Sequence, residues 1–295
     1  MTHAYWDREV GVRLEIESGD GVVVECAAPI GQVTPTWTDD DYANADPSLA
    51  HALSGAMYVK GARPGDTLEI DVLQMEHKGW GWSGHLPDFG LLADDFDSAH
   101  LHHWELDGAI CRFADRIEVP AEPFPGVIGV APRERGRLDT FPPRSDGGNL
   151  DTRDLVAGST AWLPIHAHGA LFSIGDCHSA QGDGEVLRER PGVADDGGHQ
   201  VVGASDLDVA EFQARRRTRP ALSDSDVHIT TAHGPDLYEN ARAATRYIIE
   251  WLGTNCGLEP ADAYLLCSAA NLRISEIVDA PNWVVSVHFP LDIFR

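Results

Sequence analysis

The densest group of side chains capable of chemistry is the segment GDCHSAQGDGE, residues 175–185. Asp176 and His178 stand two residues apart after the apolar run ALFSI, so on an extended strand both side chains point to one face. A carboxylate and an imidazole on one face can bind the same divalent metal, and zinc accepts both donors. The same composition is also typical of a Gly- and Asp-rich turn that solvates the end of a hairpin. The spacing alone does not decide between the two interpretations.

Several other residues could complete such a metal site. Asp151, in GGNLDTRDL, or a distant histidine could supply a third ligand and leave a position open for water. Glu185 has the chemistry of the general base that a metal-activated water requires. His51 precedes an apolar run that is typical of a buried strand. His166 and His168 share the two-residue spacing, but the adjacent glycine favours the tip of a hairpin for them.

Nucleophilic catalysis has fewer candidates. Cys177 lies beside His178, which would suit a thiolate nucleophile. However, neighbouring residues of a strand point to opposite faces, so we expect Cys177 to pack away from the polar cluster. The chain has no G-x-S-x-G motif, which disfavours a serine hydrolase of that type. Its only lysines are Lys60 and Lys78, so few residues could act in a Ser–Lys mechanism.

Composition excludes several classes of partner. The chain of 295 residues carries 47 acidic and 22 basic side chains, a net charge of −25. Such a surface repels nucleic-acid phosphates and anionic membranes. The sequence shows no long uncharged apolar run and no signal-peptide pattern. It has five cysteines, an odd number, and no C-x-x-C motif. These features predict a cytoplasmic protein with reduced thiols.

Most of the chain has the pattern of strands and turns. The segment VGVRLEIESGDGVVVECA predicts a hairpin, and AMYVKGARPGDTLEIDVL repeats the arrangement. Two further strands are predicted on either side of HAHG within residues 155–178. We expect a structured loop over 80–100, and a mobile loop or irregular crossing over the polar stretch 189–226.

Helical spacing appears only near the C-terminus. Residues 236–257 place an apolar stripe on one side of a helix, for which Gly253 is the predicted stop. A second, shorter helix is predicted to begin near Pro260, and residues 282–294 have the pattern of a strand.

Three long segments resemble one known family. GGNLDTRDLVAGSTAWLP, GALFSIGDCHSAQGDGE and LRISEIVDAPNWVVSVHFPLDIF closely resemble sequences of the acetamidase/formamidase family. Shorter matches run through HAYWD, SGDGVVVEC, GARPGDTLEIDVL, HKGWGWSGHLPDFGLLADDF and FPGVIGVAP, so the resemblance covers nearly the whole chain in order. The chain departs from the family pattern at Lys60, where an acid is common, and in the segment after Glu185, which leaves the range of substrates open.

The resemblance implies a fold and an activity. The expected fold is mainly β, a jelly-roll-like sandwich plus a barrel-like β region, with a small helical segment near the C-terminus. We expect one family unit over 1–295, divided into a β-rich N-terminal segment (1–145), a metal and catalytic β segment (146–225) and an α+β C-terminal segment (226–295). The implied activity is hydrolysis of a short, neutral aliphatic amide to ammonia and carboxylate, outside peptide bonds, in a cytoplasmic homo-oligomer (dimer or higher). A non-catalytic protein that binds a metal or small molecule on the same scaffold is the alternative.

The resemblance also carries over a set of site residues. It implies a divalent metal, zinc or else calcium, near these positions, and the division of roles is our inference from their chemistry. The expected metal ligands are His51, Asp151 and His178. The expected catalytic residues are Glu185, Asp176 and Asp183. The expected substrate-binding residues are Gln181 and Asn149.

Overall fold

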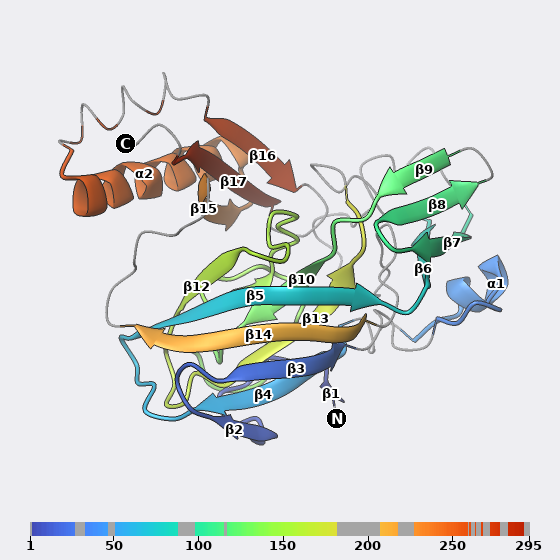
Figure 1. The fold of residues 1–295 in the computed structure, drawn as a ribbon, viewed down its shortest axis with the longest axis horizontal. Helices are drawn as coiled ribbons and strands as arrows, with labels where there is room; N and C mark the ends of the chain where they lie inside the picture. The colour runs from blue at the N-terminus through green and yellow to red at the C-terminus, as the bar shows by residue number, and fades with distance from the viewer. Residues whose placement is uncertain are drawn as a thin grey trace.

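The computed structural model describes residues 2–26, 33–46, 51–87, 98–114, 117–181, 207–217, 227–258, 260, 263, 267, 272–277 and 283–291. These residues form four sheets accompanied by helices α1 and α2 (Figure 1). The protein is therefore mainly β, as its sequence predicts. Within these described residues, the strand order of each sheet is open and none closes into a barrel. No described helix has both the length and the apolar character needed to span a bilayer.

Two sheets pack face to face as a sandwich. The first has the order β1 (Thr2–His3), β4 (Leu53–Val59), β13 (Phe172–His178), β10 (Phe124–Gly129) and β11 (Gly147–Asn149), with β2 (Leu14–Ile16) beside β4. The second has the order β12 (Thr160–Pro164), β5 (Thr67–His77), β14 (Leu207–Arg217) and β3 (Gly21–Cys26). Met57 and Phe172 of the first sheet join Ile70 and Leu163 of the second in one buried cluster. Burial of this shared apolar surface holds the two sheets together.

Two smaller sheets lie at the ends of the sandwich (Figure 1). One consists of β6 (Trp80–His85), β7 (His100–Asp107), β8 (Ile110–Ala114) and β9 (Ile117–Pro120), and the short helix α1 (Asp39–Ala43) packs Tyr42 edge-on against Trp82. The other has β17 (Trp283–Pro290) between β15 (Val227–Gly234) and β16 (Arg273–Ile277), and is covered by α2 (Leu237–Cys256).

The two faces of β17 have different neighbours. Val287 and Phe289 pack with the helix residues Ala244 and Ile248 in a buried apolar cluster. Because alternate residues of a strand point to opposite faces, His288 lies on the other face, where it contacts Asp154 of the segment after β11. The C-terminal sheet therefore presents polar side chains to the sandwich.

The predicted hairpins are wrong, although their strands exist. β2 runs parallel to β4, while β3 pairs with β14, so β2 and β3 do not pair with each other. The turns at 17–20 and 60–66 both lead from the first sheet of the sandwich to the second. The strands on either side of His166 and His168 likewise belong to different sheets, and His168 is exposed. Local turn residues predicted the reversal of the chain, whereas packing of two sheets decided the pairing.

Other boundaries differ for local reasons. Helix α2 begins after the N-cap Asp236 and ends at Gly257, whose φ of 71° is left-handed, so Gly253 lies inside the helix. Residues 80–85 form a strand rather than a loop, because they pair antiparallel with β7. Gly84 leaves room for the Tyr42 ring, which a Cβ there would approach to 2.7 Å. Residues 207–217 form β14, between β5 and β3, and the rest of 189–226 lies outside the described residues. Both sandwich sheets combine strands from segments 1–145 and 146–225.

The packing of β15 against α2 should make the stability of the protein sensitive to acid. His228 stacks on Trp251 with ring centroids 4.1 Å apart, and burial lowers the pKa of His228 to about 4. The unfolded chain protonates this ring below its ordinary value of 6.5, so the stabilising difference is complete above pH 6.5 and is lost as the pH falls toward 4. When the pH falls from 7 to 4.5, we expect the unfolding free energy of the wild type to decrease by roughly 2–3 kcal/mol more than that of His228→Gln. Urea denaturation at both pH values measures this, and equal losses would contradict it.

Candidate metal centre

Three fully buried side chains converge near the C-terminal end of β13. Asp176 and His178 lie on that strand, and Asp151 follows β11. One donor atom from each residue lies within 4.8 Å of the donors of the other two. The Nε2 atom of His178 is 3.5 Å from Asp176 Oδ1 and 3.6 Å from Asp151 Oδ1. These separations exceed the 2.7–2.9 Å of a direct charge-assisted hydrogen bond, so the three residues surround a common point.

The two aspartates of the trio have an unusual backbone conformation. Asp151 has φ 45° and Asp176 has φ 47°, both in the left-handed region that side chains other than glycine rarely adopt. Aspartate tolerates this region better than most residues, because its short side chain can bond locally. Such strain persists only where the surroundings impose it, and it concentrates at functional sites.

Gly126 leaves open the space in front of the two donors. It lies in β10 opposite Asp176, between the pairs Pro125–Cys177 and Val127–Gly175. A Cβ at position 126 would lie 2.5 Å from Asp151 Oδ1 and 2.7 Å from both His178 Nε2 and the Asp176 carbonyl oxygen. A side chain there would therefore occupy the space into which these donor atoms point.

Gln181 fixes the tautomer of His178. Its Nε2 atom donates to the carbonyl oxygen of Asp151 at 2.8 Å, and a carbonyl can only accept. Its Oε1 atom is therefore the one 2.7 Å from His178 Nδ1, which must carry the hydrogen and donate. This leaves the lone pair of a neutral His178 on Nε2, directed at the two carboxylates. Metal-binding histidines are typically held in this way by a partner on the second ring nitrogen.

The electrostatics of the trio call for a positive charge. Burial lowers the pKa of His178, but the nearby charges of Asp176 and Asp151 outweigh this effect and raise it overall. Two buried carboxylates that face a lone pair are costly unless a cation compensates them. A set of two carboxylates and one imidazole is a donor set that divalent cations bind. The residues present therefore fit a metal.

The other predicted residues have varied positions. His51 is 1% exposed, its Nε2 lies 3.5 Å from Asp176 Oδ2, and its ring packs on Phe141. Asn149 is buried, and among the described residues neither atom of its side-chain amide has a hydrogen-bond partner. Glu185 and Asp183 lie outside the described residues.

Cys177 faces away from the trio. Its side chain belongs to the core of the sandwich, where a hydrogen bond with Cys26 and burial raise the pKa of its thiol. A thiol with a raised pKa in an apolar core is a poor nucleophile, which agrees with the expectation from strand alternation.

The C-terminal sheet forms one wall of a narrow gap beside Asp151, and the sequence did not predict this contact. This gap is lined by Asp151 and Gln181 from the site and by Ser275, Glu276 and Ser286 from β16 and β17. The segment LRISEI belongs to the family resemblance, but its spacing predicted only a strand. Gly126 was equally missed, because nothing local distinguishes it from a turn glycine.

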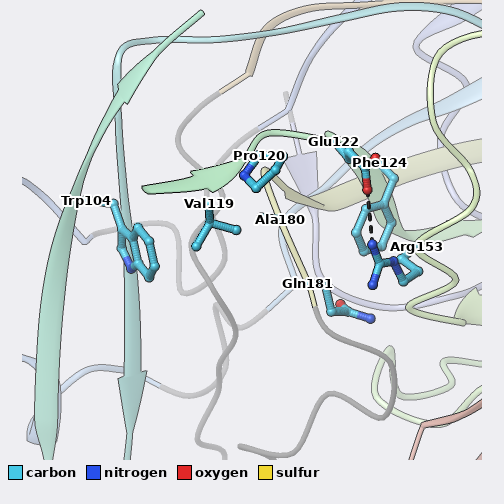
Figure 2. A pocket seen from close by; sticks show the side chains of 8 residues that line it. All are labelled: Trp104, Val119, Pro120, Glu122, Phe124, Arg153, Ala180 and Gln181. Atoms are coloured by element: carbon cyan, nitrogen blue, oxygen red, sulfur yellow. Dashed lines mark hydrogen bonds and ion pairs between the residues drawn. The ribbon is translucent and has the colours of Figure 1, made fainter. Parts of the chain in front are cut away.

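A larger cavity of about 580 Å³ lies on the other side of Gln181 (Figure 2). Arg153 pairs with Glu122 at 3.0 Å at one end of it, beside Phe124 (Figure 2), and Arg153 and Gln181 line both this cavity and the narrow gap. The rest of the lining is apolar and consists of Trp104, Val119, Pro120, Phe124 and Ala180. The Phe124 ring also packs against His178, with centroids 4.9 Å apart. The cavity therefore adjoins the residues that support the trio.

Comparison with known proteins places this site in a family. The sequence model of the acetamidase/formamidase family matches residues 1–135, 135–188 and 225–295. This chain belongs to the acetamidase/formamidase family. A Schizosaccharomyces pombe protein with a provisional formamidase name is 27% identical over 99% of this chain and 90% of its own length. The formamidase of Methylophilus methylotrophus is 25% identical over 99% and 89%, respectively. A solved acetamidase from Bacillus halodurans superimposes with a TM-score of 0.86 at 26% identity, covering 99% of this chain and 96% of that one.

The role of Gln181 in this family member is testable. Leucine at position 181 would remove both hydrogen bonds, to His178 Nδ1 and to the Asp151 carbonyl. Loss of such an orienting partner typically costs 10–100-fold in metal affinity, and we expect Gln181→Leu to weaken zinc binding by about that factor. Competition with a chromogenic chelator measures the affinity. The exposed Gln74 offers a matched control, and equal affinities of Gln181→Leu and Gln74→Leu would contradict the role.

Proposed function

We propose that this acetamidase/formamidase family member hydrolyses a short aliphatic amide, of the formamide or acetamide type, to ammonia and a carboxylate. The observation that carries the proposal is the buried trio of Asp151, Asp176 and His178, with Nε2 of the histidine directed at both carboxylates. The relatives named formamidase and acetamidase support the choice of reaction. Amides of this kind are neutral, so the surface charge of −25 neither attracts nor repels them.

We propose zinc as the metal held by the trio. A donor set with an imidazole suits zinc, whereas calcium takes six to eight oxygen ligands. When bound, a zinc ion supplies Lewis acidity, which polarises a carbonyl and lowers the pKa of water. Gln181 presents the His178 lone pair to the ion, and Gly126 keeps the space in front of the donors open.

Other residues of the chain would bind the amide and move protons. The buried side-chain amide of Asn149 can donate to a substrate carbonyl and accept from a substrate NH₂ group. Glu185 remains our proposed general base, because its position in GDCHSAQGDGE places a carboxylate near the trio along the chain. The same carboxyl group would return the proton to the leaving nitrogen, which must be protonated to depart as ammonia.

An ammonia-release screen tests this function. Formamide, acetamide and propionamide are incubated with the purified protein, and metal content is measured on the same preparation. We expect ammonia release from at least one amide, its loss after dialysis against a chelator, and its recovery on addition of zinc. Binding of amides without turnover of any of them would contradict the proposal and favour a binding protein on the same scaffold.

We also propose that the protein is a cytoplasmic homo-oligomer. The family resemblance supports the oligomer, and the five cysteines, all present as free thiols, suit a reducing compartment. Light scattering coupled to size-exclusion chromatography tests the assembly, for which a mass of 32.0 kDa would indicate a monomer and contradict it.

A further inference from the structure

A further cavity, of about 870 Å³, lies between the sandwich and the C-terminal sheet (Figure 1). Residues of β12 and of the segment after β11 line it together with residues of β15 and α2. The metal trio of Asp151, Asp176 and His178 is not part of its lining. A formamide or acetamide molecule would occupy only a small part of this volume, which falls in the range of pockets that hold larger organic ligands.

Part of the cavity wall is aromatic. Trp251 of α2 stacks on His228 of β15, with ring centroids 4.1 Å apart and planes inclined by 18°. The ring of Trp162 on β12 lies 6.3 Å from that of His228, and its Nε1 atom donates to Glu69 Oε2 at 3.0 Å. Rings held in place by such contacts favour a ligand with an aromatic ring system.

Several hydroxyl groups of the lining are already bonded within the chain. Thr230 donates to the Ala244 carbonyl at 2.7 Å. Thr160 donates to Asp71 at 2.8 Å, and Ser159 donates to a carbonyl of its own turn at 2.7 Å. A hydroxyl has a single hydrogen, so none of the three has one left to donate to a ligand. Their contribution to the cavity is therefore mostly apolar.

The charged side chains of the lining are compensated by residues outside it. Arg144 lies 3.4 Å from Asp146, and Asp154 accepts from Arg273 at 2.9 Å, but neither Asp146 nor Arg273 lines the cavity. Burial lowers the pKa of both histidines of the lining, so their rings are neutral at pH 7. A charged ligand would lose its hydration here without gaining an uncompensated opposite charge. The lining therefore favours a neutral ligand.

We propose that this cavity is a second binding site, which takes a neutral, mostly apolar organic molecule with an aromatic ring system. The rings of the ligand pack beside Trp162, His228 and Trp251. Val227 and Tyr247 are lining residues that remain exposed, and they give such a molecule an apolar entry. The inference does not depend on the proposed amide hydrolysis, because the cavity and the metal trio share no residue.

A matched pair of fluorescent probes tests the class of ligand. Anilinonaphthalene is neutral, whereas its sulfonate carries the same rings with one negative charge. Each is titrated into the full-length, zinc-loaded protein in about 0.5 M salt, which screens the surface charge of −25. We expect saturable binding of one neutral probe per chain, and binding of the sulfonate at least about 10-fold weaker. Equal or tighter binding of the sulfonate, or no saturable binding of the neutral probe, would overturn the inference.

Two tyrosines of α2 test the location of the site. Both are exposed, but Tyr247 lines the cavity and Tyr238 does not. Loss of an aromatic contact should weaken binding of the neutral probe to Tyr247→Ala by about 3–10-fold, whereas Tyr238→Ala should bind it like the wild type. Equal affinities of the two variants would overturn the assignment to this cavity.

A substitution that fills the cavity gives a larger effect. Ala243 lines the cavity from α2, so Ala243→Phe places a new ring in the space of the ligand and should weaken probe binding at least about 10-fold. Ala43→Phe makes the same change at an exposed alanine of α1 and should leave the affinity unchanged. Undiminished probe binding by a folded Ala243→Phe protein would contradict the proposal.

The remaining outcomes separate this inference from the proposed function and from another occupant. Protein dialysed against a chelator should bind the neutral probe as tightly as zinc-loaded protein does, and loss of probe binding with the metal would overturn a separate site. Absence of amide turnover would refute the proposed function and leave this inference standing. Light scattering during the titration tests a second copy of the chain as the occupant. Dissociation of a dimer as the probe binds would overturn the inference in favour of an interface between copies.

Discussion

Replacing Asp151 with asparagine should remove the bound metal and the amidase turnover together. Asparagine has the same shape as aspartate and also tolerates the left-handed backbone at this position, where φ is 45°. The substitution therefore removes one negative charge with little disturbance of the backbone. Loss of a supporting partner alone costs 10–100-fold in metal affinity, so loss of a ligand charge should cost at least about 100-fold.

Stability measurements separate this effect from misfolding. Without metal, the wild type buries Asp151 and Asp176 around one point, and removal of one charge relieves that repulsion. We expect metal-free Asp151→Asn to unfold at a temperature no lower than the metal-free wild type. Asp71→Asn, at a carboxylate of β5 that accepts from Thr160, is the matched control and should retain zinc and turnover. An Asp151→Asn protein with full zinc content and full kcat would refute the assigned ligand.

A single methyl group at position 126 should abolish metal binding. In Gly126→Ala the new Cβ would lie 2.5 Å from Asp151 Oδ1 and 2.7 Å from His178 Nε2, far inside the 3.5–4.0 Å of favourable contact. Overpacking of this kind typically costs 1–3 kcal/mol in stability, and the displaced donors could no longer converge. We expect zinc affinity to fall at least about 100-fold, with turnover lost in parallel, as measured by zinc titration and ammonia release.

Gly11 provides the control for this substitution. A Cβ at Gly11 would meet no atom within 4 Å, and its φ lies outside the positive range that disfavours side chains. Gly11→Ala should therefore change stability by less than about 0.5 kcal/mol and leave zinc binding intact. If Gly126→Ala binds zinc as tightly as Gly11→Ala, the space in front of the donors is not the metal position.

The metal trio was partly predictable from the sequence. The two-residue spacing of Asp176 and His178 after an apolar run correctly placed both at one site, and the same alternation placed Cys177 in the core. The spacing could not rank Asp176 as a donor above His51, because that choice depends on the left-handed backbone at Asp176, which no local pattern encodes. The sequence likewise did not predict the hydrogen bond between Gln181 and His178, since an exposed turn could contain the same residues.

Long-range packing accounts for what the sequence did not reveal. Alternating apolar residues predicted most strands, yet β2 and β3 joined different sheets because the shared core of the sandwich outweighs the local turn. The importance of Gly126 could not be predicted locally, because it arises where β10 passes in front of Asp151 and His178, which belong to two later segments of the chain. Ser275 approaches the gap because one face of the C-terminal sheet is covered by α2, which leaves the polar face toward the sandwich.

The most direct test of this account is an anomalous-diffraction experiment on crystals of the zinc-loaded, amide-hydrolysing protein. Data collected above and below the zinc absorption edge locate the metal independently of any activity assay. The account predicts a strong zinc peak in contact with Asp151, Asp176 and His178. An active crystal preparation with no peak at these residues, or with zinc held only elsewhere, would contradict it.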